Sequence, residues 1–216
     1  MNILPAIAAA KDEMVAIYRD LHANPELGFE ETRTSKIVAE KLAEYGVDEV
    51  HTGLGKTGVV AVIHGKSAGN RRIGLRADMD ALPIDEISGV SFASQTSGKM
   101  HACGHDGHTT MLLGAARHLS ETRDFNGTAV LIFQPAEEGL GGARQMIADG
   151  LFEKFPVNEI YGMHNSPNGR PGTFDICNGV AMAGAMFFDA HIRGVGSHAA
   201  MPQQSRDAVM IASTLV

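Results

Sequence analysis

Hydrophobic residues recur at helical spacing in two segments near the start of the chain. Between residues 4 and 22 the apolar positions lie close to three or four apart, which predicts a helix that ends before "ANPELG". Between 32 and 45 the apolar positions share one face, and Gly46 supplies a C-terminal stop. We therefore predict two amphipathic helices at the start of the chain.

Beyond residue 46 the pattern alternates between short strands and helices. The strand candidates are β-branched or alternating runs bounded by glycine, and one is a continuous apolar run suited to burial on both faces. This alternation predicts a layered α/β fold with parallel strands in the middle of its sheet. The predicted strands are 58–65, 71–77, 127–133 and 159–164, and the predicted helices are 111–119 and 142–149.

The pattern shifts again at about residue 185. Residues 185–194 alternate like a strand with one solvated face, and 205–216 begin like a helix. One strand and one helix are too little to bury their own apolar face. We therefore expect one domain over 1–184 and the incomplete beginning of a second over 185–216, so that the chain is a fragment of a longer protein.

Composition and charge narrow the classes of partner. The chain has 216 residues, 44% of them hydrophobic, and a formal net charge of −7, which is typical of a globular protein with a core. Its Lys and Arg residues are scattered, so we expect neither nucleic acid nor a membrane as a partner. Its first residues lack a basic, hydrophobic leader, and we expect a cytoplasmic protein.

Chemically reactive side chains follow the predicted strands. The carboxyl ends of parallel strands meet at one edge of a sheet, where α/β proteins bind ligands, so we expect these side chains to lie together. They are Arg76, Asp78 and Asp80 after one strand, Glu137 and Glu138 after another, His164 at the end of a third, and Cys103 and His105 just before a helix.

Cys103 and His105 are separated by one glycine, which lets a loop turn both side chains toward one ion. Thiolate, imidazole and carboxylate ligands suit zinc or, with more oxygen ligands, manganese or cobalt. The alternative is a buried Cys103 beside ordinary loop histidines. A redox thiol is a weaker hypothesis, because the only other cysteine, Cys177, is far away in sequence.

The adjacent carboxylates Glu137 and Glu138 repel each other unless a cation lies between them. One of them can ligate a metal while the other takes a proton from water. The alternative is a solvated loop. For Asp78 we favour a role in fixing a histidine tautomer, although Arg76 could simply neutralise it. His101 has no settled role, and His108 points along an apolar helix face, as a core or supporting residue would.

Together these motifs resemble the M20 metallopeptidases. The resemblance is to the amidohydrolase subfamily, with its hippurate hydrolases, N-acyl-amino-acid amidohydrolases and plant auxin-conjugate hydrolases, and it runs in order along essentially the whole chain. The matching segments are "LHANPELGFEE" (21–31), "RADMDALPI" (76–84), "MHACGHDGH" (100–108), "QPAEEG" (134–139), "MHN" (163–165) and "GVGSHAAMP" (194–202).

The resemblance implies a three-layer, zinc-peptidase-like catalytic domain interrupted by a smaller α+β lid that also dimerises. It implies two divalent ions (Zn, Mn or Co), held by Cys103, His105, Glu138 and His164. Glu137 would be the general base, and His198 would bind substrate. One more histidine ligand follows the lid in the family, beyond Val216.

The implied activity is hydrolysis of the amide bond of a small N-acyl amino acid such as hippurate. In its full-length form the protein is expected to be a homodimer or a higher homo-oligomer. The alternative from another class is a catalytically inactive, metal-binding or interaction fragment of such an enzyme.

Overall fold

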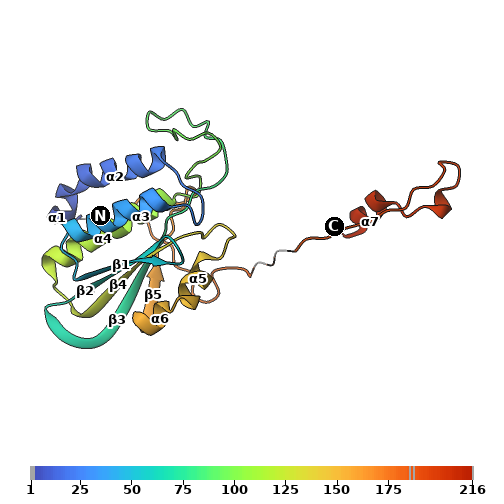
Figure 1. Cartoon of the computed structure of the whole chain (residues 1–216). Coiled ribbons are helices and arrows are strands. Elements are labelled where there is room, and N and C mark those ends of the chain that lie inside the picture. Colours follow the sequence, from blue (N-terminus) through green and yellow to red (C-terminus); the bar gives the residue numbers. More distant parts are fainter. Residues whose placement is uncertain (1–2, 185, 187, 216) are drawn as a thin grey trace. The chain divides into compact units, whose positions relative to one another are not determined.

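The computed structural model describes residues 3–184, 186 and 188–215, and Figure 1 shows its elements. The chain divides into two compact units, Met1–Arg170 and Pro171–Val216. The predicted domain boundary after residue 184 stays a prediction.

The first unit is built on a five-stranded mixed sheet with the strand order β1-β2-β4-β3-β5. β3 runs parallel to both β4 and β5, while β2 pairs antiparallel with β4 and β1 pairs antiparallel with β2. The predicted α/β fold with parallel strands is therefore confirmed. The strands are β1 (Glu49–Leu54), β2 (Gly58–His64), β3 (Ser67–Asp78), β4 (Asn126–Gln134) and β5 (Glu159–Gly162).

Helices cover both faces of this sheet, which gives three layers (Figure 1). Alternate residues of a strand point to opposite faces. In β2, Val59 joins the core beneath one set of helices and Val60 joins the core beneath the other. Burial on both faces explains why β2 and β4 are continuous apolar runs. One face carries α2 (Lys11–Ala23), α3 (Thr32–Glu44) and α4 (His105–Thr122), and the other carries α5 (Gly142–Ala148) and α6 (Leu151–Lys154).

Three details of the first unit differ from the sequence-based expectation, and one of them is the short helix α6, which was not predicted. The first predicted helix is two helices, α1 (Pro5–Ala9) and α2, separated at Ala10. Strand β1 was not predicted, because its sequence EVHTGL is largely exposed at the sheet edge and has no apolar alternation. The other predicted helices and strands are present, with ends shifted by a few residues.

In the second unit, the predicted terminal helix is present as α7 (Ala208–Leu215), preceded by a 3₁₀ turn at Pro202–Gln204. The strand expected over 185–194 is not formed by those of its residues that the structure describes; residues 185 and 187 lie outside them. Met186 and Phe188 lie two residues apart, as the predicted alternation requires, but both side chains are exposed. Side chains as exposed as these do not supply the packing that stabilises a strand.

None of the helices in the described part of the chain combines the length and apolar character that crossing a bilayer requires.

Candidate metal centre

The sheet register brings the candidate residues to one edge. Asp78, the last residue of β3, pairs with Gln134, the last residue of β4, and Arg76 pairs with Gly162 at the end of β5. The segments that follow these three strands therefore leave the sheet side by side, as expected for a ligand-binding edge.

Helix α4 begins at this edge with His105 as its first residue. Its N-cap, Gly104, has a φ of +92°, and a Cβ there would lie 2.4 Å from the side chain of Asn165. Only glycine fits this backbone and this close approach. The glycine of the Cys103-Gly-His105 motif thus lets the helix start directly beside the segment that carries His164.

The structure brings together five of the predicted residues, which we call the site cluster: Cys103, His105, Glu137, Glu138 and His164. The Cys103 Sγ lies 3.4 Å from His164 Nε2. The His105 Nε2 lies 3.9 Å from a Glu138 oxygen and 4.0 Å from a Glu137 oxygen. His105 belongs to every candidate group of metal ligands in the described residues.

The Cys103–His164 separation lies within the range for two ligands of one ion, and the two His105–glutamate separations are slightly longer than that range and too long for hydrogen bonds. Two atoms that each lie about 2.0–2.3 Å from one tetrahedral ion are about 3.3–3.8 Å apart, whereas nitrogen-to-oxygen hydrogen bonds are about 2.7–3.2 Å long. His105 is only 1% exposed, and its Nε2 has no hydrogen-bond partner in the described part of the chain. A buried polar atom without a partner calls for an explanation, and a divalent cation supplies one.

Asp78, at the end of β3, and Asp80, just after it, both lie next to buried histidines. Asp80 Oδ1 lies 3.3 Å from His105 Nδ1, and Asp80 Oδ2 accepts the backbone N–H of Glu138 at 2.9 Å. Asp78 lies 2.7 Å from Arg76 and 2.6 Å from Nδ1 of His108. The sequence favoured Asp78 as a residue that fixes a histidine tautomer, and the structure places it against His108 and 3.6 Å from Nε2 of His105. Its role at a metal site stays a prediction. Asp78 combines its ion pair with Arg76 and a bond to His108.

The charged groups at this site shift one another's pKa values. Burial would raise the pKa of Asp78, but its hydrogen bond with His108 and the charge of Arg76 bring it down to about 2. Burial would lower the pKa of His105, but Asp80 and the nearby carboxylates raise it. Burial and the Glu138 carboxylate raise the pKa of the Cys103 thiol to about 11.

The other two histidines of the motif are buried. His108 donates from Nδ1 to Asp78, and its Nε2 accepts the backbone N–H of Asn165 at 3.0 Å. It therefore supports the segment next to His164. His101 has no hydrogen-bond partner among the described residues, and burial lowers its pKa to about 4.

Sequence reasoning missed a second group of histidine and carboxylates beside the site cluster. His22, on α2, lies 2.6 Å from Asp106 through Nδ1 and 3.1 Å from Glu86 through Nε2. We call these three residues the His22 cluster. Asp106 directly follows His105 in α4. The partners are 84 and 64 residues from His22 along the chain, so no local spacing could reveal them.

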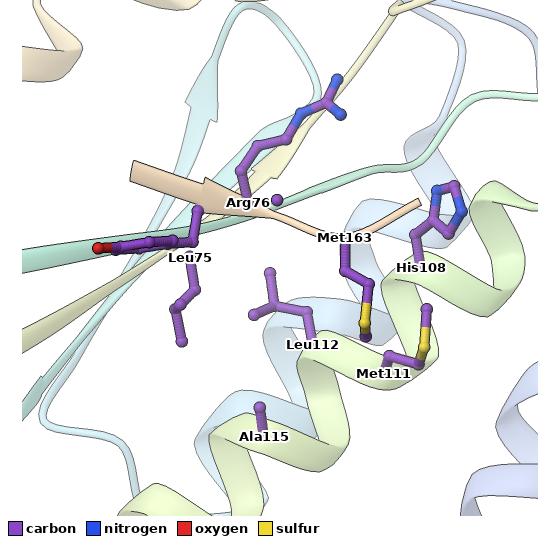
Figure 2. A pocket seen from close by; sticks show the side chains of 9 residues that line it. Leu75, Arg76, His108, Met111, Leu112, Ala115 and Met163 are labelled. Carbon is purple, nitrogen blue, oxygen red and sulfur yellow. The ribbon is translucent and has the colours of Figure 1, made fainter. Parts of the chain in front are cut away.

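An apolar cavity of about 190 Å³ borders the site without containing any of the predicted ligands. Figure 2 shows that Met111, Leu112 and Ala115 line it from α4, with Leu75 on the side of the sheet. Arg76 and His108 also line this cavity, and both of them bond to Asp78.

His198, the predicted substrate-binding residue, belongs to the second unit. Its Nδ1 accepts the backbone N–H of Ala200 at 3.2 Å. It lies in a pocket with Ser197 and Arg206. Its role with substrate stays a prediction.

The protein has a three-layer α/β fold. The site cluster, at the carboxyl edge of its sheet, consists of residue types that bind metal ions. Residues 74–213 match Peptidase family M20/M25/M40. The chain belongs to this family.

Several relatives and one solved structure are similar over much of the chain. The hippurate hydrolase of Campylobacter jejuni is 47% identical over 216 residues, which are 100% of this chain and 56% of that protein. The N-acetyl-L-cysteine deacetylase of Bacillus subtilis is 43% identical over 97% of this chain and 50% of its own length. The chain thus spans about half the length of these relatives.

The similar structure is that of the Bacillus subtilis YXEP protein, described as a dinuclear metal binding peptidase from the M20 family. It superimposes with a TM-score of 0.70 and is 43% identical, covering 74% of this chain and 45% of that chain.

Proposed function

We propose that the site cluster is the metal centre of an enzyme that hydrolyses the amide bond of N-acyl amino acids. The observation that carries this proposal is the convergence of thiol, imidazole and carboxylate groups from three segments around the unpartnered Nε2 of His105. Two relatives are named for N-acylated amino acids, hippurate and N-acetyl-L-cysteine. The similarity to a dinuclear protein supports two ions.

In this proposal Cys103, His105, Glu138 and His164 hold two divalent ions, which can be zinc, manganese or cobalt. Bound ions would polarise the amide carbonyl and make water more acidic. The chemistry of the ligand set fits such ions, because it combines a soft sulfur with nitrogen and oxygen donors.

Glu137 is the proton-transfer group. Its side chain is 37% exposed, while that of His105 is 1% exposed, so the Glu137 carboxylate can meet both solvent and substrate. It takes a proton from the attacking water and delivers it to the leaving amine nitrogen. Asp80 orients the ring of His105 from behind.

The remaining parts of the proposal concern the protein as a whole. His198 contacts the substrate, the residues from 185 onward begin a lid and dimerisation domain, and the protein works in the cytoplasm as a homodimer or higher homo-oligomer. The similarity of 194–202 to the family motif and the family match through residue 213 support the roles given to His198 and to the residues from 185 onward.

Metal analysis followed by hydrolysis assays tests the proposal. Protein loaded with Zn²⁺, Mn²⁺ or Co²⁺ should retain metal after gel filtration and release the free amino acid from hippurate or an N-acetyl-amino acid. The same preparation treated with a chelator is the control. Metal-loaded protein that cleaves none of a panel of acyl amino acids, or protein that retains no metal, would refute the proposal.

A further inference from the structure

The turn that carries Glu137 and Glu138 has an unusual backbone. β4 ends at Gln134, and two residues later Ala136 has a φ of +50°. This left-handed region is unfavourable for a residue with a Cβ, and such strain persists only where neighbouring structure enforces it. Ala136 is fully buried. The direction in which the two glutamates leave the sheet therefore depends on what holds Ala136.

Glu31 makes the contact that holds Ala136. One of its carboxylate oxygens accepts the Ala136 backbone N–H at 2.8 Å, and the other accepts the Thr57 hydroxyl at 2.5 Å. Glu31 has no exposed surface, and no Lys, Arg or His among the described residues forms an ion pair with it. Burying a carboxylate without a basic partner costs free energy. The burial of Glu31 therefore needs an explanation.

The position of Glu31 at the start of α3 is a second reason to assign a role to this contact. Glu31 is the N-cap residue of α3, yet its side chain makes no capping bond to that helix. Its carboxylate instead reaches a turn 105 residues away in the sequence. Gly28, in the same motif, lies against this turn, since a Cβ there would be 3.0 Å from Ala136.

Two carboxylates thus hold the turn on either side of Glu137. Glu31 accepts the N–H of Ala136, and Asp80 accepts the N–H of Glu138. Asp80 also touches His105. The carbonyl of Ala136 accepts the N–H of Gly142 at 3.0 Å, which closes the turn against α5. Removing one of these contacts frees a strained backbone directly before the two glutamates.

We propose that Glu31 is a positioning residue, whose buried carboxylate holds the Ala136 amide and thereby aims Glu137 and Glu138 into the metal site. This inference rests on the proposed function for the identity of the site. The contact itself, between Glu31 and the turn, is a property of the metal-free chain.

Three variants distinguish a positioning role of Glu31 from an effect of its charge and from an effect on the stability of the fold. In Glu31→Gln, the amide oxygen can still accept the Ala136 N–H, and the amide group can donate to Thr57. In Glu31→Ala, the contact is lost. Thr57→Val is the matched control, because it removes the second bond of Glu31 and leaves the Ala136 bond intact.

The affinity for Zn²⁺ or Mn²⁺ is the first measurement. Loss of a supporting contact at a metal site typically weakens binding about 10- to 100-fold, and we expect Glu31→Ala to fall in this range. Glu31→Gln should recover most of the affinity, and Thr57→Val should bind like the wild type. Hydrogen exchange of the Ala136 amide in metal-free protein should accelerate in Glu31→Ala only.

The outcomes distinguish the two proposals. A wild-type chain that binds no metal would refute the proposed function. Wild-type affinity in Glu31→Ala, with only a lower melting temperature, would leave the proposed function standing and refute the positioning role.

If Glu31→Ala does not fold, Glu31→Asp replaces it. This variant keeps the charge but is one methylene shorter, so it should bind metal more weakly than Glu31→Gln. The reverse order would refute the inference.

Discussion

Two clusters of histidine and carboxylate side chains lie side by side at the start of α4, and they differ in how well their atoms satisfy one another. In the His22 cluster the ring nitrogens are 2.6 and 3.1 Å from carboxylate oxygens, which are hydrogen-bond lengths. In the site cluster the Nε2 of His105 is 3.9 and 4.0 Å from the nearest Glu138 and Glu137 oxygens. The same residue types satisfy one another in one place and, in the proposed function, are completed by a cation in the other.

This contrast shows why residue type alone does not identify a metal site. His22 and His105 are both buried next to acids. Only the spacing and the missing hydrogen bonds separate a structural histidine from a candidate ligand. Variants in each cluster test this difference.

The largest expected effect is on turnover in the site cluster. Glu137→Gln removes the proposed proton acceptor but keeps the size of the side chain, so hydrolysis by the full-length protein should fall by about 10²- to 10⁴-fold, the usual contribution of a general base. Metal content should stay at the wild-type level. Glu153→Gln, at an exposed position of α6, is the matched control and should not change turnover. Equal loss of metal and turnover in Glu137→Gln would contradict the assignment.

The second effect is on the reactivity of Cys103. A bound Zn²⁺ or Mn²⁺ should protect the thiol of Cys103 from alkylation, and a chelator should remove that protection, because a ligated sulfur is not free to attack the reagent. Cys177 is exposed in the second unit and serves as an internal control. Peptide mass spectrometry reads both sites. Equal alkylation of Cys103 with and without metal would show that Cys103 is not a metal ligand.

The smallest effect is on stability in the His22 cluster. Burial alone would lower the pKa of His22, but the bonds to Asp106 and Glu86 raise it. Burial would raise the pKa of Glu86, but bonds from Ser88, Ser94 and His22 bring it down to about 2. We expect His22→Gln to lower the free energy of unfolding by about 2 kcal/mol, as for hydrogen bonds to charged groups.

The pH dependence of this loss has a definite sign. The contribution of His22 is complete below its ordinary pKa of about 6.5 and is lost as pH rises through the raised value in the folded state. The contribution of Glu86 is complete above the ordinary glutamate pKa of 4.5 and is lost as pH falls toward 2. Denaturant unfolding should therefore show the largest difference between wild type and His22→Gln at about pH 4.5–6.5.

A control variant sharpens this measurement. His51 pairs with Glu49 on the surface, where both side chains are more than 40% exposed. An exposed pair contributes little, although the His51 ring also packs against Phe155, so His51→Gln should lower stability less than His22→Gln does. A pH-independent loss in His22→Gln would mean that the charges of the His22 cluster do not contribute.

Much of the fold and part of the site follow from the sequence for identifiable reasons. β2 and β4 were predictable because strands buried on both faces must be apolar throughout. The convergence of Cys103, Glu138 and His164 followed from the position of each near the end of a strand or the start of a helix. The roles assigned to Glu137 and Glu138 came from the family motif.

What the sequence did not reveal depends on contacts between distant segments. β1 is an exposed edge strand whose polar sequence carries no period. The contact of Asp80 with His105 and that of Glu31 with Ala136 join residues 25 and 105 positions apart. A contact of this kind requires only two complementary polar groups, so it leaves no spacing pattern to detect.

The central claim is that Cys103 and its neighbours hold a divalent ion. Titration of the metal-free chain with Co²⁺, followed by absorption spectroscopy, tests it most directly, because a thiolate bound to cobalt adds an intense near-ultraviolet band. We predict that this band appears in the wild type and in Cys177→Ser and is absent in Cys103→Ser. Cobalt binding without the band, or a band that survives in Cys103→Ser, would contradict the claim.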